Sequence, residues 1–261
     1  MVSFMSHDDS NLLSPNHLAI LRDAEEYQRR VEKLVVVQDN DLVSGCYKLT
    51  LNPKRLLLLV ISKMDSQSDD WKYAAEEQLI SVDDWCDAYG IDKRNGKKTL
   101  WEAANDLFEA SIRIGSFRRG AEFRFLQHRA WDEEQNSVAV TFTQELLRFS
   151  TGIYTDFTKY TLLTVKEMKS NYAIRLYELA CQYQRIGKRT IAVDDLRDML
   201  GVESGQYEKF GDFNKWVLKR AAQEANLKGN LDIDVVPVRK GKKVAAITLY
   251  ISAKQQSQFD F

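Results

Sequence analysis

The chain has 261 residues, of which 44% are hydrophobic and 29% charged, which is enough to build the cores of two ordinary domains. No run of about 18 apolar residues is present, and no basic segment precedes an apolar one at the start of the chain, so we expect neither a membrane-spanning helix nor a secretion signal. The three cysteines, Cys46, Cys86 and Cys181, are odd in number and widely spaced. This spacing argues against a disulfide framework or a zinc site and favours a cytoplasmic protein.

The formal net charge of −1 conceals a division along the chain. Residues 1–154 contain 19 Lys and Arg against 25 Asp and Glu, a balance of −6, whereas residues 155–253 contain 17 against 12, a balance of +5. Within the first part, residues 93–129 contain 9 basic and 4 acidic residues, again +5. These local charges matter more than the total, because the attraction of phosphates is screened beyond roughly 10 Å.

Helical and strand patterns alternate along the chain. The N-terminal segment, residues 1–43, is expected to be partly helical, with a helix over 17–37 that packs on the first domain or contributes to dimerisation. Apolar spacing predicts further helices over residues 53–64, 98–109, 170–183 and 213–227. Alternation of apolar and polar residues predicts strands over residues 111–117, 122–129, 137–142, 231–238 and 244–251.

A sequence repeat divides the chain into two similar halves. Residues 80–92 and 191–203 have Val, three Asp and Gly at the same positions, with an offset of 191 − 80 = 111 residues, about one domain. In the first copy Ser81 is placed to cap a helix, and Gly90 is placed to end it in the left-handed conformation. Gly201 has the same place in the second copy. A short helix that ends at glycine is typical of the first helix of a helix-turn-helix.

The order of helix, helix-turn-helix and basic-tipped hairpin is that of a winged helix, and it occurs twice. We therefore predict an α+β protein built from two tandem winged-helix domains, one over residues 44–152 and one over residues 153–253, followed by a tail over 254–261. The first domain is expected to serve dimerisation and contacts to the DNA backbone. The second is expected to carry the main DNA recognition.

The helix over residues 213–227 has the pattern of a DNA-recognition helix. Its apolar face is opposed by Lys215, Lys219, Gln223 and Asn226, which suit a major groove because lysine reaches phosphate or guanine and the amides read adenine. An ordinary solvated helix face would look similar. The basic hairpin that follows favours DNA, because a wing beside a recognition helix grips backbone phosphates. Its basic residues are Arg239, Lys240, Lys242 and Lys243.

The first domain has two basic groups that could contact DNA, one at the start of its second helix and one at a hairpin tip: Arg94, Lys97, Lys98, Arg118 and Arg119. The helix itself has an acidic side between residues 102 and 109, which a phosphate backbone would repel. We therefore expect this domain to touch DNA through the basic group and the hairpin, taken as its wing. The alternative is that it mainly contacts protein.

Signals for catalysis, cofactors or metals are lacking, so we expect no enzyme. The histidines, His7, His17 and His128, form no His-x-His pair of the kind with which rolling-circle nickases bind metal. No Gly-x-x-x-x-Gly-Lys-Ser/Thr loop for nucleotide phosphates occurs. Tryptophans at positions 71, 85, 101, 131 and 216 could stack on bases, although core packing explains most of them.

Three blocks in the second half resemble the initiator replication (Rep) proteins of theta-replicating, iteron-containing plasmids. They are residues 170–179 (SNYAIRLYEL), 195–201 (DLRDMLG) and 210–221 (FGDFNKWVLKRA), and the likeness extends from about Tyr47 to Ile251. Glu224 and Asn226 match an acidic residue and an asparagine that usually follow in this family. The proline that the family often carries near Arg220 is absent.

This resemblance implies that the protein binds direct repeats (iterons) at its origin as a monomer, helps to melt adjacent AT-rich DNA, and recruits the host initiator and helicase. It also implies a homodimer, in equilibrium with the monomer and formed through the first winged helix, that binds an inverted repeat and represses the protein's own gene. By resemblance, the residues that read bases are in the second domain: Asn214, Lys215, Lys219, Arg220 and Gln223.

Three other functions stay open from the sequence. A winged-helix transcriptional regulator would use the same modules but would neither melt an origin nor recruit host proteins. A scaffold whose winged helices bind protein would bind DNA weakly and with little dependence on salt. A nickase would cleave supercoiled origin DNA in a metal-dependent reaction. The DNA sequence recognised cannot be read from the side chains alone, since DNA shape contributes to recognition.

Overall fold

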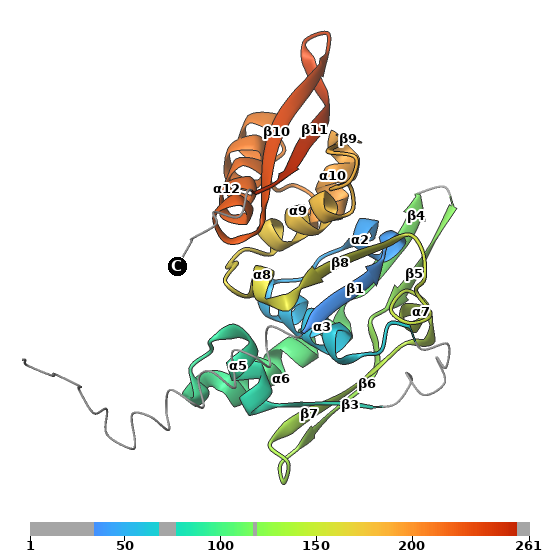
Figure 1. The fold of residues 1–261 in the computed structure, drawn as a ribbon, viewed down its shortest axis with the longest axis vertical. Helices are drawn as coiled ribbons and strands as arrows, with labels where there is room; N and C mark the ends of the chain where they lie inside the picture. Colours follow the sequence, from blue (N-terminus) through green and yellow to red (C-terminus); the bar gives the residue numbers. More distant parts are fainter. Residues whose placement is uncertain (1–33, 68–76, 117–118, 255–261) are drawn as a thin grey trace, which may run out of the picture.

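A computed structural model describes residues 34–67, 77–116 and 119–254, which form two units arranged along the long axis of the molecule (Figure 1). Some expected features lie outside these described residues. They are the part of the N-terminal helix up to residue 33, Trp71, Arg118 and the tail from residue 255 onward.

The segment before residue 44 joins the body of the protein as a strand. β1 (Val35–Asp39) pairs antiparallel with β8 (Phe157–Thr161), and α2 (Asn40–Ser44) follows it. The helix expected to reach residue 37 is therefore wrong for residues 35–37. Consecutive valines favour a strand, because their branched side chains pack well on a pleated surface, and alternation places Val36 and Gln38 inside the protein.

The first unit contains the elements of a winged helix in the predicted order. They are α3 (Leu51–Lys63), β3 (Gln78–Ser81), α5 (Val82–Tyr89), α6 (Lys93–Glu109), β6 (Leu126–Asp132) and β7 (Ser137–Phe142). The Ser81 side chain accepts a hydrogen bond from the Asp84 amide, and Gly90 ends α5 with a φ of 63°. The cap and the stop predicted from the repeat are both confirmed.

Helix α6 begins at Lys93 rather than at residue 98. Asp92 caps it, because the Asp92 carboxylate accepts a hydrogen bond of 2.9 Å from the Arg94 amide. Gly96 then allows a close approach to α5, since a Cβ at this position would clash with the Cys86 Sγ. The basic residues expected near the start of this helix therefore all lie within its first turns.

The second unit repeats this arrangement. The unit begins with α8 (Leu162–Lys166) and α9 (Asn171–Cys181). They are followed, in order, by β9 (Lys188–Ala192), α10 (Val193–Leu200), a helical segment over residues 210–228, β10 (Leu231–Lys240) and β11 (Lys243–Ala253). In each unit, the strand before the helix-turn-helix pairs with the second strand of a hairpin, and the first strand of that hairpin completes the sheet. The sheet orders are β3-β7-β6 and β9-β11-β10. This shared topology confirms two tandem winged helices of the α+β class.

The wing of the first unit is not the hairpin that we expected. Residues 122–129, predicted as one strand, belong to two strands in different sheets, β5 (Arg119–Arg124) and β6. β5 pairs with β4 (Ser111–Ser116), which pairs with β2 (Cys46–Tyr47). The chain changes sheet at Phe125 and Leu126, two consecutive buried residues that break the strand alternation.

The hairpin equivalent to β10–β11 is therefore β6–β7. The end of β6 and the turn that leads into β7 are acidic, with Asp132, Glu133 and Glu134. The basic β4–β5 hairpin is an addition to the winged-helix pattern, so Arg119 does not lie on the equivalent of a wing. α7 (Gln144–Leu147) follows β7.

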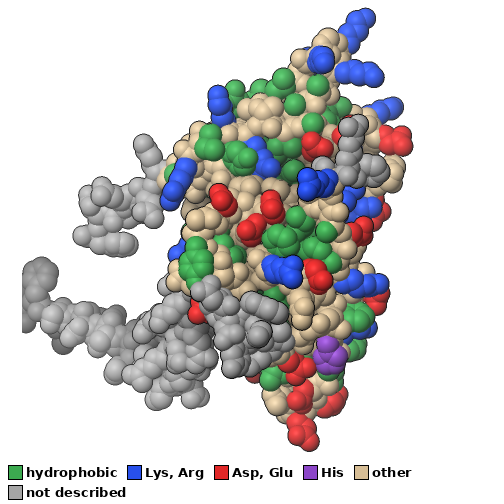
Figure 2. Space-filling model, turned by 90° about the vertical axis from the view of Figure 1, so that its right-hand side faces the viewer, with side chains coloured by type: hydrophobic (Ala, Val, Ile, Leu, Met, Phe, Trp, Pro, Cys, Tyr) green, Lys and Arg blue, Asp and Glu red, His purple; other side chains and the backbone are tan. Residues whose placement is uncertain are grey.

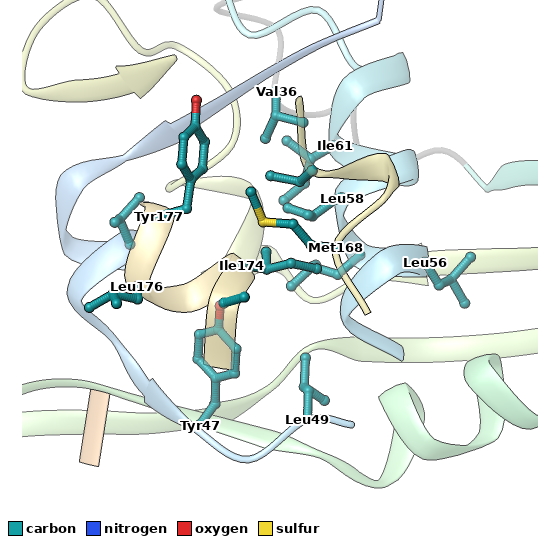
Figure 3. Close-up of a cluster of buried hydrophobic side chains, with 14 of the residues drawn as sticks. Val36, Tyr47, Leu49, Leu56, Leu58, Ile61, Met168, Ile174, Leu176 and Tyr177 are labelled. Atoms are coloured by element: carbon teal, nitrogen blue, oxygen red, sulfur yellow. The ribbon is translucent and has the colours of Figure 1, made fainter. Parts of the chain in front are cut away.

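One continuous apolar core extends through both units. Figure 3 shows Val36 of β1 and Leu58 and Ile61 of α3 near Met168 and Ile174 from the second half of the chain. Helix α9 packs against α12 (Lys219–Lys228) of the second unit and also against β8 and α2. This helix therefore belongs structurally to both units.

Two further contacts join the units near the start of β2. Gly201, with a φ of 73°, lies so close to β2 that a Cβ would be 2.5 Å from the Tyr47 carbonyl oxygen. Arg113 of β4 forms an ion pair of 2.7 Å with Asp198 of α10. Glycine is thus required at position 201 both by its backbone conformation and by the space available.

A buried group of charges lies between the units around Glu178 of α9. The Glu178 carboxylate is 2.8 Å from the Lys54 Nζ and 2.9 Å from the Arg175 Nη1, and all three side chains are fully buried. The Tyr160 hydroxyl donates to it over 2.6 Å and the Gln38 amide over 3.2 Å. Burial alone would raise the pKa of Glu178, but the Lys54 and Arg175 charges outweigh it and lower this pKa to about 2.

Arg175 extends this network to the backbone of both units. Its guanidinium donates to the carbonyl oxygens of Val43 and Gly45 at 3.0 and 2.9 Å, and to that of Met199 in α10 at 2.9 Å. The buried charges are therefore both paired and hydrogen-bonded, which is the condition under which charges are tolerated inside a protein.

We predict that Glu178→Gln lowers the free energy of unfolding by about 3 kcal/mol at pH 7, because it leaves Lys54 and Arg175 buried without a counter-charge. Folding lowers the pKa of Glu178 from its ordinary value of 4.5 to about 2. The stabilisation by its charge is therefore complete above pH 4.5 and is lost as the pH falls from 4.5 toward 2. Urea unfolding at pH 7 and at about pH 3 measures both effects.

The matched control is Glu167→Gln, which removes an exposed carboxylate paired with Lys228. This variant should differ little from the wild type at either pH, since exposed pairs contribute little. A Glu178→Gln variant as stable as the wild type at pH 7, or equally destabilised at both pH values, would contradict the assigned role of the buried carboxylate.

Candidate nucleic-acid interface

The helix predicted over residues 213–227, referred to below as the recognition helix after its expected role, is confirmed and extends over residues 210–228. It consists of α11 (Phe210–Asp212), a wide π-helical turn η1 (Phe213–Leu218) and α12. The residues that it buries are Phe213, Val217, Leu218, Ala221, Ala222 and Ala225. The residues that it exposes include Lys215, Trp216, Lys219, Arg220 and Gln223. The division into an apolar and a basic face therefore agrees with the sequence pattern.

The start of this helix is held by Arg197 of α10. Its guanidinium carbon lies 4.2 Å from the centroid of the Phe213 ring, and its Nη2 donates to the Tyr207 carbonyl oxygen over 2.7 Å. Farther along, the Glu224 carboxylate accepts a hydrogen bond of 2.6 Å from the Lys169 amide. These contacts orient the helix, so its exposed side chains project from a defined surface.

Asn226 is not available to read a base, contrary to the sequence interpretation. Its amide nitrogen donates to the Ile233 carbonyl oxygen over 3.0 Å, and its amide oxygen accepts from the Ile233 amide over 2.8 Å. Both polar atoms of the side chain are thus used to fasten α12 to β10. Asn214 is half-buried, and its Oδ1 is buried without a hydrogen-bond partner among the described residues.

The wing β10–β11 projects beyond the rest of its sheet (Figure 1). β9 pairs only with residues 246–250 of β11, so the end of the hairpin extends past its third strand. Its tip turns at Gly241, which has a φ of 64°. All four basic side chains predicted at the wing are exposed: Arg239, Lys240, Lys242 and Lys243.

The cations of the recognition helix and of the wing have no acidic partners in the part of the chain that the structure describes. Within the described ranges, no carboxylate lies within 4.0 Å of the recognition-helix cations Lys215, Lys219 and Arg220 or of the wing cations. Figure 2 shows Lys and Arg side chains projecting at the end of the molecule that carries this wing, whereas Asp and Glu gather at the opposite end. Cations without a carboxylate partner can neutralise phosphates without first breaking an ion pair.

The basic group of the first unit has internal carboxylate partners instead. Arg94 pairs with Asp92 at 2.6 Å, Lys97 pairs with Glu133 at 2.7 Å, and Lys98 lies 3.8 Å from Glu102. Hydrogen bonds from Lys97 and then from Trp131 lower the pKa of Glu133, which keeps this acid of the β6–β7 turn ionised.

The acidic side of α6 is exposed, as expected, at Glu102, Asp106 and Glu109. Arg119 is exposed on β5. The structure therefore brings Lys97 together with the acidic turn that replaces the expected basic wing, and it places Arg119 on a different hairpin, β4–β5.

In the described part of the chain, no group of three or more His, Cys, Asp or Glu side chains is arranged to hold a metal ion. Cys46, Cys86 and Cys181 are free thiols. None of the described helices is both long enough and apolar enough to cross a membrane.

Two winged helices, one with an exposed basic recognition helix and a basic wing, define a DNA-binding protein of the winged-helix class. Sequence models of the two domains of initiator replication proteins match residues 35–181 (Initiator Replication protein, WH1) and 192–251 (Initiator Rep protein, WH2). The chain therefore belongs to the initiator replication protein family, which confirms the resemblance noted in the sequence. The first match ends beyond the domain border expected at residues 152 and 153.

The chain is also similar to a protein of known structure and to a protein known from its sequence. The crystal structure of the Pi initiator protein in complex with iteron DNA has a TM-score of 0.70 and 18% identity, and the match covers 86% of this chain and 99% of that one. This likeness shows that the fold is shared. An uncharacterised 27.6 kDa protein of Escherichia coli is 23% identical over 214 residues, which cover 76% of this chain and 87% of that protein.

We predict different effects on stability for two amide side chains on the same helix. Asn226→Ala should lower the free energy of unfolding by about 1–3 kcal/mol, because it leaves the buried Ile233 backbone groups without their partners. Gln223→Ala should leave stability within about 0.5 kcal/mol of the wild type, since Gln223 is exposed. Thermal or urea unfolding of both variants measures this difference, and equal stabilities for the two would contradict the fastening role of Asn226.

Proposed function

We propose that this protein initiates DNA replication by binding direct repeats (iterons) at the origin of the DNA molecule that encodes it, with the second winged helix reading the bases. The observation that carries the proposal is the exposed basic face of the recognition helix together with its basic wing, both free of carboxylate partners among the described residues. The family of the chain and its structural similarity to Pi, which was crystallised with iteron DNA, support it.

The residue types on the recognition helix suit a major groove. Lys215, Lys219 and Arg220 can donate to guanine or phosphate, and Gln223 can form a bidentate contact with adenine. Asn214 is retained as a candidate from the family resemblance. The wing residues Arg239, Lys240, Lys242 and Lys243 would hold backbone phosphates, which position the protein without reading sequence.

The first winged helix has a secondary role in DNA binding in this proposal. Its candidate residues would contact the DNA backbone; they are Arg94, Lys97, Lys98, Arg118 and Arg119. Arg94, Lys97 and Lys98 would each have to leave a carboxylate partner in order to bind a phosphate. The proposal also includes dimerisation through this domain, in equilibrium with the monomer, and repression of the protein's own gene by the dimer. Origin opening and recruitment of the host initiator and helicase complete it.

The decisive experiment measures binding to a duplex that carries the direct repeats, titrated with salt, for the wild type and for Lys215→Ala/Lys219→Ala. We expect tight repeat-specific binding by the wild type. The double variant should lose at least roughly tenfold in affinity. The slope of log affinity against log salt should become shallower by up to the equivalent of about two phosphate contacts.

The matched control is Lys97→Ala/Lys98→Ala in the first unit, which removes the same charge from lysines that already have carboxylate partners. This variant should lose much less affinity. Weak binding by the wild type with no preference for the repeats would contradict the initiator function. Repeat-specific binding without origin melting would instead favour a transcriptional regulator.

The wing should contribute affinity without specificity. We expect Lys240→Ala and Lys242→Ala each to weaken binding by a similar factor on the repeat and on a scrambled duplex, and to reduce the salt dependence by about one phosphate contact. Fluorescence anisotropy with both duplexes at several salt concentrations measures this. A loss confined to the repeat duplex would show that the wing reads sequence and would contradict the assignment.

A further inference from the structure

Trp216 lies on the recognition helix with its side chain at the surface. The residue retains 39% of its accessible area, whereas Trp85 is fully buried. The indole N–H groups of Trp85 and Trp131 donate to Thr99 and Glu133, but that of Trp216 has no acceptor among the described residues. Trp216 therefore offers a partly exposed aromatic ring on the same face of the helix as Lys215 and Arg220.

The wide turn η1 determines how Trp216 is presented. Phe213 and Val217, on either side of it in this turn, are both fully buried. The stacking of Arg197 on the Phe213 ring anchors the first residue of the turn. Such π-helical turns cost hydrogen-bond geometry and are found frequently at functional sites. The local structure therefore anchors the residues around Trp216 while leaving its ring outside the core.

Two cations surround the exposed ring. The Lys215 Nζ lies 4.4 Å from the centroid of the Trp216 ring, and the Arg220 guanidinium carbon lies 4.2 Å from it. Cations held over an indole in this way fix the orientation of the ring. An apolar ring between unpaired cations is poorly suited to an apolar protein surface, because docking there would desolvate both charges. It suits an apolar group that is flanked by phosphates.

The major groove contains one such group, the C5 methyl of thymine. We propose that Trp216 is a specificity-determining residue whose indole contacts the methyl group of one thymine in the repeat, with Lys215 and Arg220 holding the ring in place. This inference rests on the proposed function, because it requires the recognition helix to lie in the major groove of the repeat.

The test replaces each thymine of the repeat in turn by deoxyuridine, which removes only the methyl group. Wild-type protein should bind about fourfold more weakly when one particular thymine is replaced, the effect of exposing one methyl-sized group to water. Trp216→Ala should bind the thymine and uracil forms of that repeat equally. Trp216→Phe, which retains an aromatic ring, should recover part of the preference.

The matched control is Leu227→Ala, which removes another exposed apolar side chain, 74% accessible, from the same helix. It should keep the full preference for thymine. If no thymine position matters for the wild type, or if the preference persists in Trp216→Ala, the methyl contact is overturned. The contact is also overturned if Trp216→Ala binds every duplex more weakly by the same factor and keeps the wild-type response to each uracil substitution. That result would show that the ring only positions its cations.

Failure of the proposed function gives a different result. In that case wild-type protein does not distinguish the repeat from a scrambled duplex, and both the proposed function and the contact fall together. Repeat-specific binding with no effect of any uracil overturns the contact alone.

Discussion

One buried carboxylate, Glu178, determines how the two winged helices are joined. Its partners come from β1, α3, β8 and α9, and Arg175 beside it also binds backbone carbonyls on both sides of the junction. Apolar residues tolerate shifts in packing, but buried charges are stable only in a geometry that satisfies all of them. The network therefore favours a single arrangement of the helix that both units share. The close approach of Gly201 to β2 restricts the same junction sterically.

The two units present opposite charges from this junction. The second unit carries, on its recognition helix and wing, cations that have no carboxylate partner among the described residues, whereas the equivalent hairpin of the first unit ends in an acidic turn that engages Lys97. The same winged-helix topology is therefore electrostatically better suited to DNA in the second copy than in the first. A phosphate backbone should meet the second unit first, because attraction is local at physiological salt. This asymmetry explains how a chain with a net charge of −1 can be a DNA-binding protein.

Local rules predicted much of this structure. Ser81, Gly90 and Gly201 act through their own backbone positions, so the repeat revealed both helix-turn-helix units and their order in the sequence alone. The sequence could not show the change of sheet at Phe125, because choosing between two sheets depends on tertiary packing rather than on alternation. It also misassigned Asn226, since an exposed-looking position on a helical wheel turned out to face a neighbouring strand. The Glu133 partner of Lys97 was missed because it lies far from Lys97 in sequence, whereas the Arg94–Asp92 and Lys98–Glu102 pairs are local and follow from sequence spacing.

The central claim, that the second winged helix reads the DNA, is tested most directly by site-specific photo-crosslinking. A benzophenone side chain would replace Gln223 on the recognition helix in one protein and Glu134 on the acidic β6–β7 turn in another, each bound to the repeat duplex. We predict crosslinks to repeat bases from position 223 and none from position 134. Crosslinks from position 134, with none from position 223, would show that the first unit occupies the groove and would contradict this account.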